Sequence, residues 1–393
     1  MYAAESLKIP CVIMRGGTSK AVFLLENDLP SDPVIRDNVI LSIYGSPDPR
    51  QIDGLGGADP LTSKLAIIGP STHPEADIDY TFGQVDIRKK FIDYSSNCGN
   101  ISSAVGPYAI QQSLIAGKSP VTTVRIHNTN TGKILISEVP MLDRLPKTLG
   151  DFQIDGVPGT GAKILLNFAG TAGSKTGRLL PTGNVRDVLN IDHFGELEVS
   201  LVDIGSPMVF VRAEDLSLKG TETPAEIDGS QKMLELLENI RAKAAEKMGI
   251  VSDWRIAVER VRAVPMVAFV SKSQTYDSYL TGESVEADTI DFVSRDMFMQ
   301  VMHKTYSVTA TVCTGSAAII PGTIVNEVMR KNKTGNSIRF GHPGGSIEIE
   351  MMSDTNHGEL TITRAAVGRT ARRIMEGCVY VPSDLVEKGI ASK

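Results

Sequence analysis

The sequence predicts an α+β protein made of two similar domains, each built on a mixed β-sheet. Strand-like runs are short and separated by turns, as at residues 21–25 and 135–139, whereas stretches with helical periodicity are few. This order differs from the regular alternation of strand and helix that predicts a parallel α/β sheet. A length of 393 residues fits two domains.

The expected elements follow the pattern of apolar residues along the chain. The clearest helix spans residues 230–248, where apolar side chains recur every three to four residues and Gly249 ends the pattern. Strands are expected at residues 11–14, 21–25, 77–82, 124–126, 135–139, 198–202 and 346–350.

Two segments of the first half have counterparts in the second half. Residues 22–29 (VFLLENDL) are similar to residues 209–216 (VFVRAEDL), and Cys98 and Cys313 are each followed by small residues. Two similar strands can match by chance. Because both similarities occur in the same order, however, they favour duplication of one domain.

The boundary between the two halves is expected in the Gly-, Pro- and Thr-containing stretch at 177–183. This gives an N-terminal domain over residues 1–183 and a C-terminal domain over residues 184–393, facing each other across a cleft. In this interpretation the last residues of the chain can pack against the N-terminal domain.

Composition and charge exclude several classes of protein. The 40 Lys+Arg against 46 Asp+Glu give a net charge of −6 without a long basic run, so nucleic acid is not an expected partner. The longest apolar stretch, residues 263–270, is far shorter than the roughly 20 residues of a membrane helix. The first residues do not have the pattern of an export signal. We therefore expect a cytoplasmic protein without a membrane partner.

The four cysteines lie too far apart for a zinc site, and a disulfide is not expected in a reducing compartment. Cys98 is instead a candidate for acid–base chemistry. It lies in the segment Asn97-Cys98-Gly99-Asn100, which reads as a turn leading into a helix. Free N–H groups and the helix dipole at such a place stabilise a thiolate and can hold a carboxylate. The polar flanking residues make a buried structural cysteine less favoured.

Cys313 is a weaker candidate in the second half. Its surroundings, with Thr314, Gly315 and Ser316 after it, suggest a similar helix start that offers hydroxyl and amide donors. We do not expect a second acid at this position.

Lys64 and Ser19 are further polar candidates in the first half. Lys64 follows a glycine-rich segment and begins an apolar run, so partial desolvation would favour the neutral amine that a general base needs. A lysine that extends along the surface is the common alternative. Ser19 ends the turn of residues 16–19, which lacks the spacing of a phosphate-binding P-loop but can present donors to an anion. A plain polar hairpin explains this turn about as well.

Residues 341–346 form a glycine-rich turn before a strand, where the backbone at Gly345 and Ser346 can approach a ligand closely. A purely structural turn explains this segment nearly as well. Residues 127–132 read as a polar hairpin loop. We find no dinucleotide-binding motif, metal cluster or Ser/His/Asp order. A cofactor-free acid–base enzyme is what remains.

Four segments together resemble the PrpF family of isomerases, which have the diaminopimelate epimerase fold, and the resemblance runs essentially end to end. The segments are residues 15–20 (RGGTSK), 54–64, 97–100 (NCGN) and 341–343 (GHP). The resemblance implies two similar domains, each a mixed, mainly antiparallel sheet wrapped around a central helix. It also implies a homo-oligomer without a metal or other cofactor.

Within the family, residues 45–54, 61–73 and 127–132 are most similar to members that interconvert 3-methylitaconate and 2,3-dimethylmaleate. The implied reaction moves a C=C bond by a 1,3-proton shift in a small unsaturated di- or tricarboxylate. Lys64 and Cys98 are the implied catalytic pair, and Cys313 is implied to be non-catalytic. The residues implied to hold the substrate carboxylates are Ser19, Asn97, Gly99, Asn100, Thr314, Gly315, Ser316, Gly345 and Ser346.

Three alternatives stay open. Other family members isomerise methylaconitate or 4-oxalomesaconate. An amino-acid epimerase or racemase would use Cys98 and Cys313 as opposed bases. A non-catalytic accessory protein would bind tricarboxylates without turnover.

Overall fold

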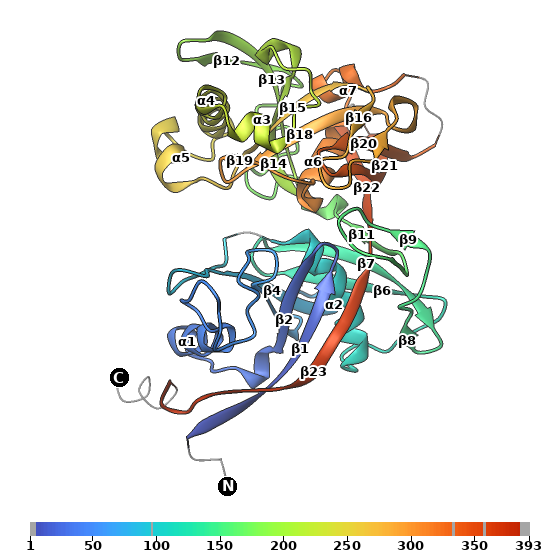
Figure 1. The fold of residues 1–393 in the computed structure, drawn as a ribbon. Coiled ribbons are helices and arrows are strands. Elements are labelled where there is room, and N and C mark those ends of the chain that lie inside the picture. Colours follow the sequence, from blue (N-terminus) through green and yellow to red (C-terminus); the bar gives the residue numbers. More distant parts are fainter. Residues whose placement is uncertain (1–4, 96, 332–334, 357–358, 386–393) are drawn as a thin grey trace. The chain divides into compact units, whose positions relative to one another are not determined.

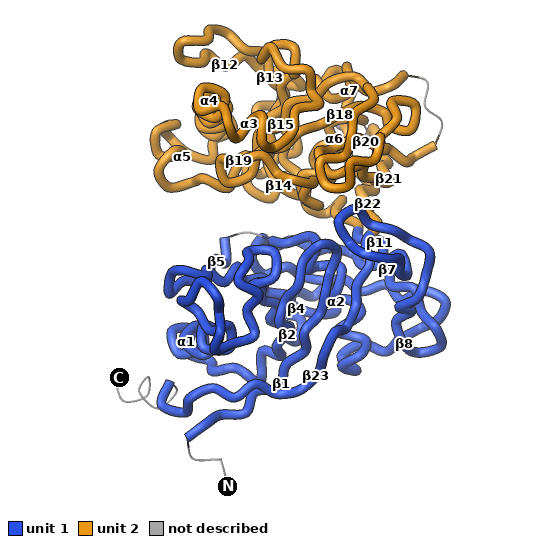
Figure 2. The backbone as a smooth tube through the Cα atoms, in the orientation of Figure 1, with its two compact units in different colours: residues 1–166, 369–393 blue, residues 167–368 orange. Residues whose placement is uncertain are grey.

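The structure is a computed structural model that describes residues 5–95, 97–331, 335–356 and 359–385 (Figure 1). The chain divides into two compact units (Figure 2). Unit 1 comprises residues 1–166 and 369–393, and unit 2 comprises residues 167–368. The chain therefore leaves unit 1 and returns to it at Arg369. The boundary expected at residue 183 lies inside unit 2.

Unit 1 is built on a sheet in which seven strands pair one after another. The β23–β1 and β1–β2 pairs are antiparallel, β2–β3 is parallel, β3–β4 is antiparallel, β4–β6 is parallel and β6–β7 is antiparallel. In this order the strands are β23 (Ala371–Pro382), β1 (Ser6–Gly16), β2 (Ser19–Leu25), β3 (Lys64–Pro70), β4 (Ile78–Val85), β6 (Val121–Asn128) and β7 (Lys133–Leu142).

The two faces of this sheet pack against different helices, because successive side chains of a strand point to opposite sides. One face contributes Val22, Leu24, Leu65 and Ile67 to an apolar core with helix α1 (Pro33–Tyr44). The opposite face packs on helix α2 (Gly99–Gln111), where the Phe23 and Tyr108 rings lie 5.1 Å apart. Residues that share a face with Phe23 therefore lie on the side of α2.

Unit 2 contains a similar sheet. The β13–β14 pair is antiparallel, β14–β15 is parallel, β15–β18 is antiparallel, β18–β20 is parallel and β20–β21 is antiparallel. Strand β12 pairs antiparallel with β13, and strand β22 pairs antiparallel with β21. The strands are β12 (Asp187–Ile191), β13 (Gly195–Ile204), β14 (Ser206–Arg212), β15 (Met266–Lys272), β18 (Phe292–Phe298), β20 (Ser337–His342), β21 (Gly345–Asn356) and β22 (Glu359–Arg369).

The same alternation of antiparallel and parallel pairs from β1 to β7 and from β13 to β21 supports the predicted duplication. The similar segments 22–29 and 209–216 fall on equivalent elements. The first covers the end of β2 and the 3₁₀ turn η1 (Glu26–Asp28), and the second covers the end of β14 and η3 (Glu214–Leu216). Helix α2 corresponds to helix α6 (Val308–Ile319), since α2 lies in the chain between β4 and β6 and α6 lies between the equivalent strands β18 and β20.

The helix expected at 230–248 is confirmed as α4 (Gln231–Lys247). Ser230 caps it, and Leu237, Ile240 and Ala244 enter the core of unit 2. The remaining helices are α3 (Pro224–Asp228), α5 (Trp254–Arg260) and α7 (Ile324–Val328), with 3₁₀ turns η2 (Ala169–Thr171) and η4 (Ala287–Thr289). Short strands are β5 (Ile92–Asp93), β8 (Leu145–Pro146), β9 (Phe152–Gln153), β10 (Thr160–Gly161), β11 (Ile164–Asn167), β16 (Tyr276–Asp277), β17 (Ser284–Val285) and β19 (Val301–Met302). Within the described residues, no helix has the length and apolarity needed to cross a bilayer.

Candidate active site

The start of helix α2 differs from the other helix starts of the described chain. Cys98 is the N-cap residue, as predicted, and its backbone is extended, but its half-buried side chain does not cap the helix. The other six α-helices each have a side-chain cap, from Asp32, Thr223, Ser230, Asp253, Ser307 and Thr323. The first N–H groups of an α-helix have no partner within the helix. At α2 these groups are therefore suited to binding an anion.

The turn between β1 and β2 lies directly against this helix start. An added Cβ at Gly16 would come within 2.4 Å of the Asn100 carbonyl oxygen, and one at Gly17 within 2.1 Å of Asn100 Oδ1. Gly17 also has a φ of +50°, which favours glycine. Asn100 Nδ2 donates to Thr18 Oγ1 at 3.0 Å. The turn and the helix are thus held in close contact.

Ser19 ends this turn with its side chain on the α2 side of the sheet, because it is four residues from Phe23 in the same strand. The residue is 2% exposed, and its hydroxyl oxygen has no hydrogen-bond partner in the part of the chain that the structure describes. A buried hydroxyl without a partner costs free energy, which a bound ligand could recover. Ser19 is therefore placed as a donor beside the start of α2.

Lys64 is the first residue of β3, at the entrance to the apolar strand as predicted. It lies opposite Gln84 of β4, and its Nζ donates to Gln84 Oε1 at 2.8 Å. The Nζ atom is 5.3 Å from the centre of the Phe82 ring, and the residue is 9% exposed. This lysine does not extend along the surface: its amine lies against an aromatic ring and a neutral amide.

The Gln84 side chain is itself held in one orientation. Its Nε2 donates to the backbone oxygens of Pro60 at 3.1 Å and Ser63 at 3.3 Å. Because both amide protons are used in this way, the amide oxygen is directed to Lys64. The glycine-rich segment before Lys64 thus contributes carbonyl groups that position the partner of the amine.

A row of side chains on β4 connects Lys64 with Cys98. Gln84, Phe82 and Tyr80 are spaced by two residues and therefore share the face that packs on α2. Burial raises the pKa of Tyr80 well above its usual range, and the nearby Cys98 thiol raises it further. Lys64 at one end and Cys98 at the other thus border the same row of side chains.

Asn97 contacts helix α2, and the loop after β6 contacts the strand that carries this row of side chains. Asn97 Oδ1 accepts from Ser102 Oγ at 3.3 Å. Asn130 Oδ1 accepts from the Phe82 N–H at 2.8 Å, and Asn130 Nδ2 donates to the Tyr94 carbonyl at 2.9 Å. The segment 127–132 is a hairpin loop, as predicted, and it also fixes the strand that carries Phe82.

Gln84 and Arg369 are not among the site residues predicted from the sequence. Gln84 has a signal in the sequence, because it is a polar residue two positions after Phe82 in an otherwise apolar strand. Arg369 has none, since its contact Asn100 lies 269 residues away along the chain. Its Nε donates to Asn100 Oδ1 at 3.2 Å.

The helix start predicted at Cys313 is wrong. Helix α6 begins at Val308 with Ser307 as its cap, so Cys313 is well inside the helix. The Cys313 thiol is fully buried and donates to the Val202 carbonyl at 3.3 Å. Burial raises the pKa of this thiol well above its usual range. The similarity between the two cysteine segments therefore marks corresponding helices but not corresponding positions.

The same shift removes the argument for Thr314, Gly315 and Ser316 as donors at a helix start. Thr314 Oγ1 lies 2.8 Å from the Tyr306 hydroxyl, and Ser316 Oγ donates to the Val312 carbonyl at 2.8 Å. An added Cβ at Gly315 would come within 2.8 Å of the Ile349 side chain. These three residues serve the packing of α6, and they are not part of the function proposed below.

Gly345 lies in a tight turn between β20 and β21, and Ser346 follows it. The Tyr276 hydroxyl donates to the His342 carbonyl at 3.0 Å and also bonds the Gly345 carbonyl. An added Cβ at Gly341 would come within 2.5 Å of the same hydroxyl. Tyr276 therefore explains the close approach that the glycines allow. A substrate role for Gly345 and Ser346 stays a prediction.

The family model of the PrpF protein matches residues 6–382, nearly the whole described chain. The chain belongs to the PrpF family. It is 55% identical over 378 residues to 3-methylitaconate isomerase of Eubacterium barkeri, covering 96% of this chain and 98% of the relative. It is 39% identical over 389 residues to 2-methyl-aconitate isomerase of Shewanella oneidensis, covering 96% and 97%.

Solved structures show the fold of this PrpF-family member. The crystal structure of methylitaconate-delta-isomerase matches with a TM-score of 0.88 and 55% identity over 97% of both chains. A hydroxyproline epimerase from Agrobacterium vitis matches with a TM-score of 0.53 and 12% identity over 96% of this chain and 93% of that one, which indicates a shared fold alone. The expected epimerase-like α+β fold is confirmed.

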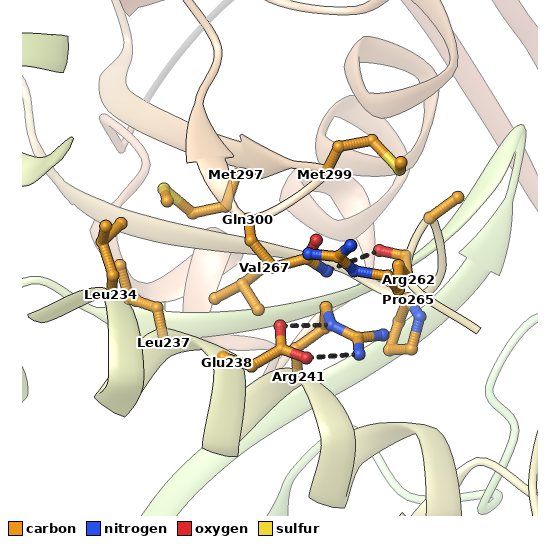
Figure 3. A pocket seen from close by; sticks show the side chains of 11 residues that line it. Leu234, Leu237, Glu238, Arg241, Arg262, Pro265, Val267, Met297, Met299 and Gln300 are labelled. Carbon is orange, nitrogen blue, oxygen red and sulfur yellow. Dashed lines mark hydrogen bonds and ion pairs between the residues drawn. The ribbon is translucent and has the colours of Figure 1, made fainter. Parts of the chain in front are cut away.

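A hollow in unit 2 of this PrpF-family chain is lined by residues that include Arg241, whose contacts are structural (Figure 3). Arg241 lies at its floor and pairs with Glu238 at 2.7 Å. The Arg241 guanidinium also donates to the carbonyls of Ala257, Val261 and Val264. This cation joins α4 to α5 and to the segment that follows α5. The residues that line the hollow include none of the predicted site residues.

Proposed function

We propose that this protein is a cofactor-independent allylic isomerase, and that it interconverts 3-methylitaconate and 2,3-dimethylmaleate. The observation that carries the proposal is the start of α2, which has no side-chain cap and lies on the same face of the sheet as the Lys64 amine and the Ser19 hydroxyl. Among the described residues this hydroxyl has no hydrogen-bond partner. The 55% identity to 3-methylitaconate isomerase supports the choice of substrate.

The start of α2 supplies the groups that the reaction needs for charge. Removal of a proton next to an alkene conjugated with a carboxylate gives a dienolate, whose charge accumulates on that carboxylate. Fixed donors that face this position lower the barrier because they bind the charge as it develops. The N–H groups at Gly99 and Asn100 and the Ser19 hydroxyl are such donors, and Asn97 stands next to them.

Lys64 is the base in this proposal. As a neutral amine, its Nζ takes the allylic proton and becomes an ammonium that donates to Gln84 Oε1, while the C–H electron pair enters the dienolate. The Cys98 thiol then gives a proton to the carbon at the other end of the three-carbon unit and becomes a thiolate. Transfer of the proton from Lys64 to Cys98 restores both groups. In the reverse reaction the two roles are exchanged.

Two of the alternative functions are less well supported. An epimerase with two opposed cysteines needs a reactive second thiol, but Cys313 is buried inside α6 and bonded to a carbonyl. A binding protein without turnover needs no amine held between a neutral amide and an aromatic ring, as Lys64 is. Methylaconitate and 4-oxalomesaconate stay as alternative substrates, because they differ from methylitaconate in substituents on the same unsaturated acid.

We also expect the enzyme to act in the cytoplasm as a homo-oligomer, without a metal or nicotinamide. Size-exclusion chromatography with light scattering measures the oligomeric state directly, and a monomer at micromolar concentration contradicts this expectation.

Proton exchange in deuterated buffer tests the proposed function. Purified protein is incubated with methylitaconate, methylaconitate and oxalomesaconate, and NMR follows both the double-bond position and the deuterium content. We expect the fastest double-bond migration with methylitaconate, with deuterium incorporated at the allylic carbons. Binding of all three acids without exchange would instead support an accessory protein.

A further inference from the structure

We propose that Arg369 is a specificity-determining residue of the carboxylate subsite at the start of α2, and that it favours substrates with two negative charges over those with one. The inference rests on the proposed function. It adds a residue from the far end of the sequence to a site that is otherwise built from residues 16–130.

Arg369 is 5% exposed and lies against two groups of the subsite. Its Nε donates to Asn100 Oδ1 at 3.2 Å, and Asn100 Oδ1 also accepts from the Thr18 N–H at 3.4 Å. The Arg369 side chain passes so close to Gly17 that an added Cβ there would come within 3.2 Å of its Cδ atom. The arginine is thus inserted between the turn and the first residues of α2.

The segment that carries Arg369 is anchored to the same turn. The Thr370 carbonyl accepts from the Gly17 N–H at 2.9 Å and from Arg15 Nη1 at 3.0 Å. Arg15 Nη1 also donates to the Gly17 carbonyl at 2.9 Å. These bonds hold the segment of Arg369 against the turn that ends at Ser19, whose buried hydroxyl has no partner among the described residues.

Arg369 brings a positive charge to the subsite. Burial lowers the pKa of Arg369 to about 10, which leaves it charged at neutral pH, and nearby Asp155 acts in the opposite direction. Burial and neighbouring Arg372 lower the pKa of Arg15. Arg369 therefore places a buried cation at this turn, although the whole chain carries a net charge of −6. Such local charge attracts an anion, and a buried guanidinium does so with little screening.

Kinetics with charged and partly esterified substrates test this role. We expect Arg369→Gln to raise KM for 3-methylitaconate by about tenfold or more, because a charge-assisted contact is lost, with a smaller change in kcat. KM for a monomethyl ester of the same acid should change little. Arg369→Lys should recover part of the affinity. Arg373→Gln is the matched control, because Arg373 contacts Gln111 at the opposite end of α2.

The variant Asp155→Asn is an independent test of the proposal, because it leaves Arg369 in place. Removing this negative charge should lower KM for the diacid and leave the monoester unaffected. Equal KM increases for diacid and monoester in Arg369→Gln would overturn the proposal. The same holds if the KM of Arg369→Gln for the diacid equals the KM of Arg373→Gln. It also holds if Asp155→Asn leaves the KM for the diacid unchanged. Calorimetric titration of both acids into these variants in a Lys64→Ala background measures binding without turnover. A diacid preference there that Arg369→Gln abolishes supports the role of Arg369 even if the wild-type protein exchanges no proton.

Discussion

The Lys64 amine and the Gln84 side-chain oxygen lie 2.8 Å apart, in directly opposite positions of two neighbouring strands. A neutral amide in this place orients the amine but does not hold its charged form as a carboxylate would. The backbone carbonyls of Pro60 and Ser63 fix the amide itself. Lys64 is thus positioned by an uncharged acceptor that is itself held in one orientation.

Replacing Lys64 should remove the chemistry. We expect Lys64→Ala to abolish deuterium incorporation at the allylic carbon, since general-base catalysis contributes about 10²- to 10⁴-fold in rate. Lys64→Met, which keeps most of the buried volume, should be equally inactive. NMR of the substrate in deuterated buffer measures both.

The matched control for Lys64 is Lys20, which pairs with Arg15 and points to the other face of the sheet. Lys20→Ala should exchange protons at nearly the wild-type rate. A fully active Lys64→Ala variant would show that Lys64 is not the base of the reaction.

Replacing Gln84 with a carboxylate should change the pH dependence of the reaction. In Gln84→Glu, a negative charge next to the amine favours the ammonium, so the base form is reached only at higher pH. We expect lower activity at pH 7 and a rate that recovers as the pH is raised. A pH–rate profile of the variant measures the shift, and Gln84→Met, which adds no charge, should not show it. A Gln84→Glu profile that coincides with the wild-type profile would contradict the assignment of Lys64 as base.

Cys98→Ser should affect activity and stability in opposite directions. Turnover should fall by several orders of magnitude, because a hydroxyl is a far weaker acid than a thiol. Serine is also a favoured N-cap, worth about 1 kcal/mol, so the unfolding free energy should rise. Steady-state kinetics and urea denaturation measure the two effects.

Cys313→Ser is the matched control for Cys98→Ser. Because Cys313 is buried inside α6, this change should leave the turnover number nearly unchanged. Equal loss of turnover in both variants would favour the two-cysteine epimerase.

Asp296 should make the stability of the fold depend on pH. Its carboxyl group is fully buried in unit 2, and neither oxygen has a hydrogen-bond partner within the described residues. Burial raises the pKa of Asp296 well above its usual range, whereas the charge of Arg295 acts in the opposite direction. The folded state therefore holds this proton more tightly than the unfolded chain, in which the pKa is about 3.9.

This proton contributes stability below about pH 4, and the contribution is lost as the pH rises toward the folded-state pKa. Asp296→Asn removes the dependence, so its unfolding free energy relative to wild type should increase between pH 4 and pH 8. Each unit of pKa difference corresponds to about 1.4 kcal/mol. Urea denaturation across this range measures the effect, with the exposed Asp288→Asn as control. A difference from wild type that does not change with pH would show that Asp296 is not neutral in the fold.

Local patterns predicted the parts of the fold that local physics determines. The periodicity at 230–248 predicted α4, and the polar turn at Cys98 predicted the start of α2. The apolar run after Lys64 predicted that β3 begins there. The similar strand ends at 22–29 and 209–216 predicted the duplication, because a strand followed by a 3₁₀ turn has a compact local sequence pattern.

Other features depend on contacts between distant parts of the chain, which no local pattern specifies. Small residues after Cys98 and Cys313 occur both at a helix start and inside a buried helix, so their similarity could not fix the position of Cys313 in α6. The pairing of β1 with β23 joins the two ends of the sequence. The contact of Arg369 with Asn100 follows from that pairing, and therefore it could not be predicted.

Unit 1 is completed by the last strand of the described chain, β23, whose backbone pairs with β1 from Ser6 to Gly16 (Figure 1). On the ribosome, β1 emerges early and must wait until about 350 residues later for this neighbour. During that time one edge of β1 stays without its partner strand, which makes the nascent chain prone to association. Unit 2 is continuous in sequence and can fold during this interval. Unit 1, which holds the candidate site, is therefore complete only after β23 has been synthesised.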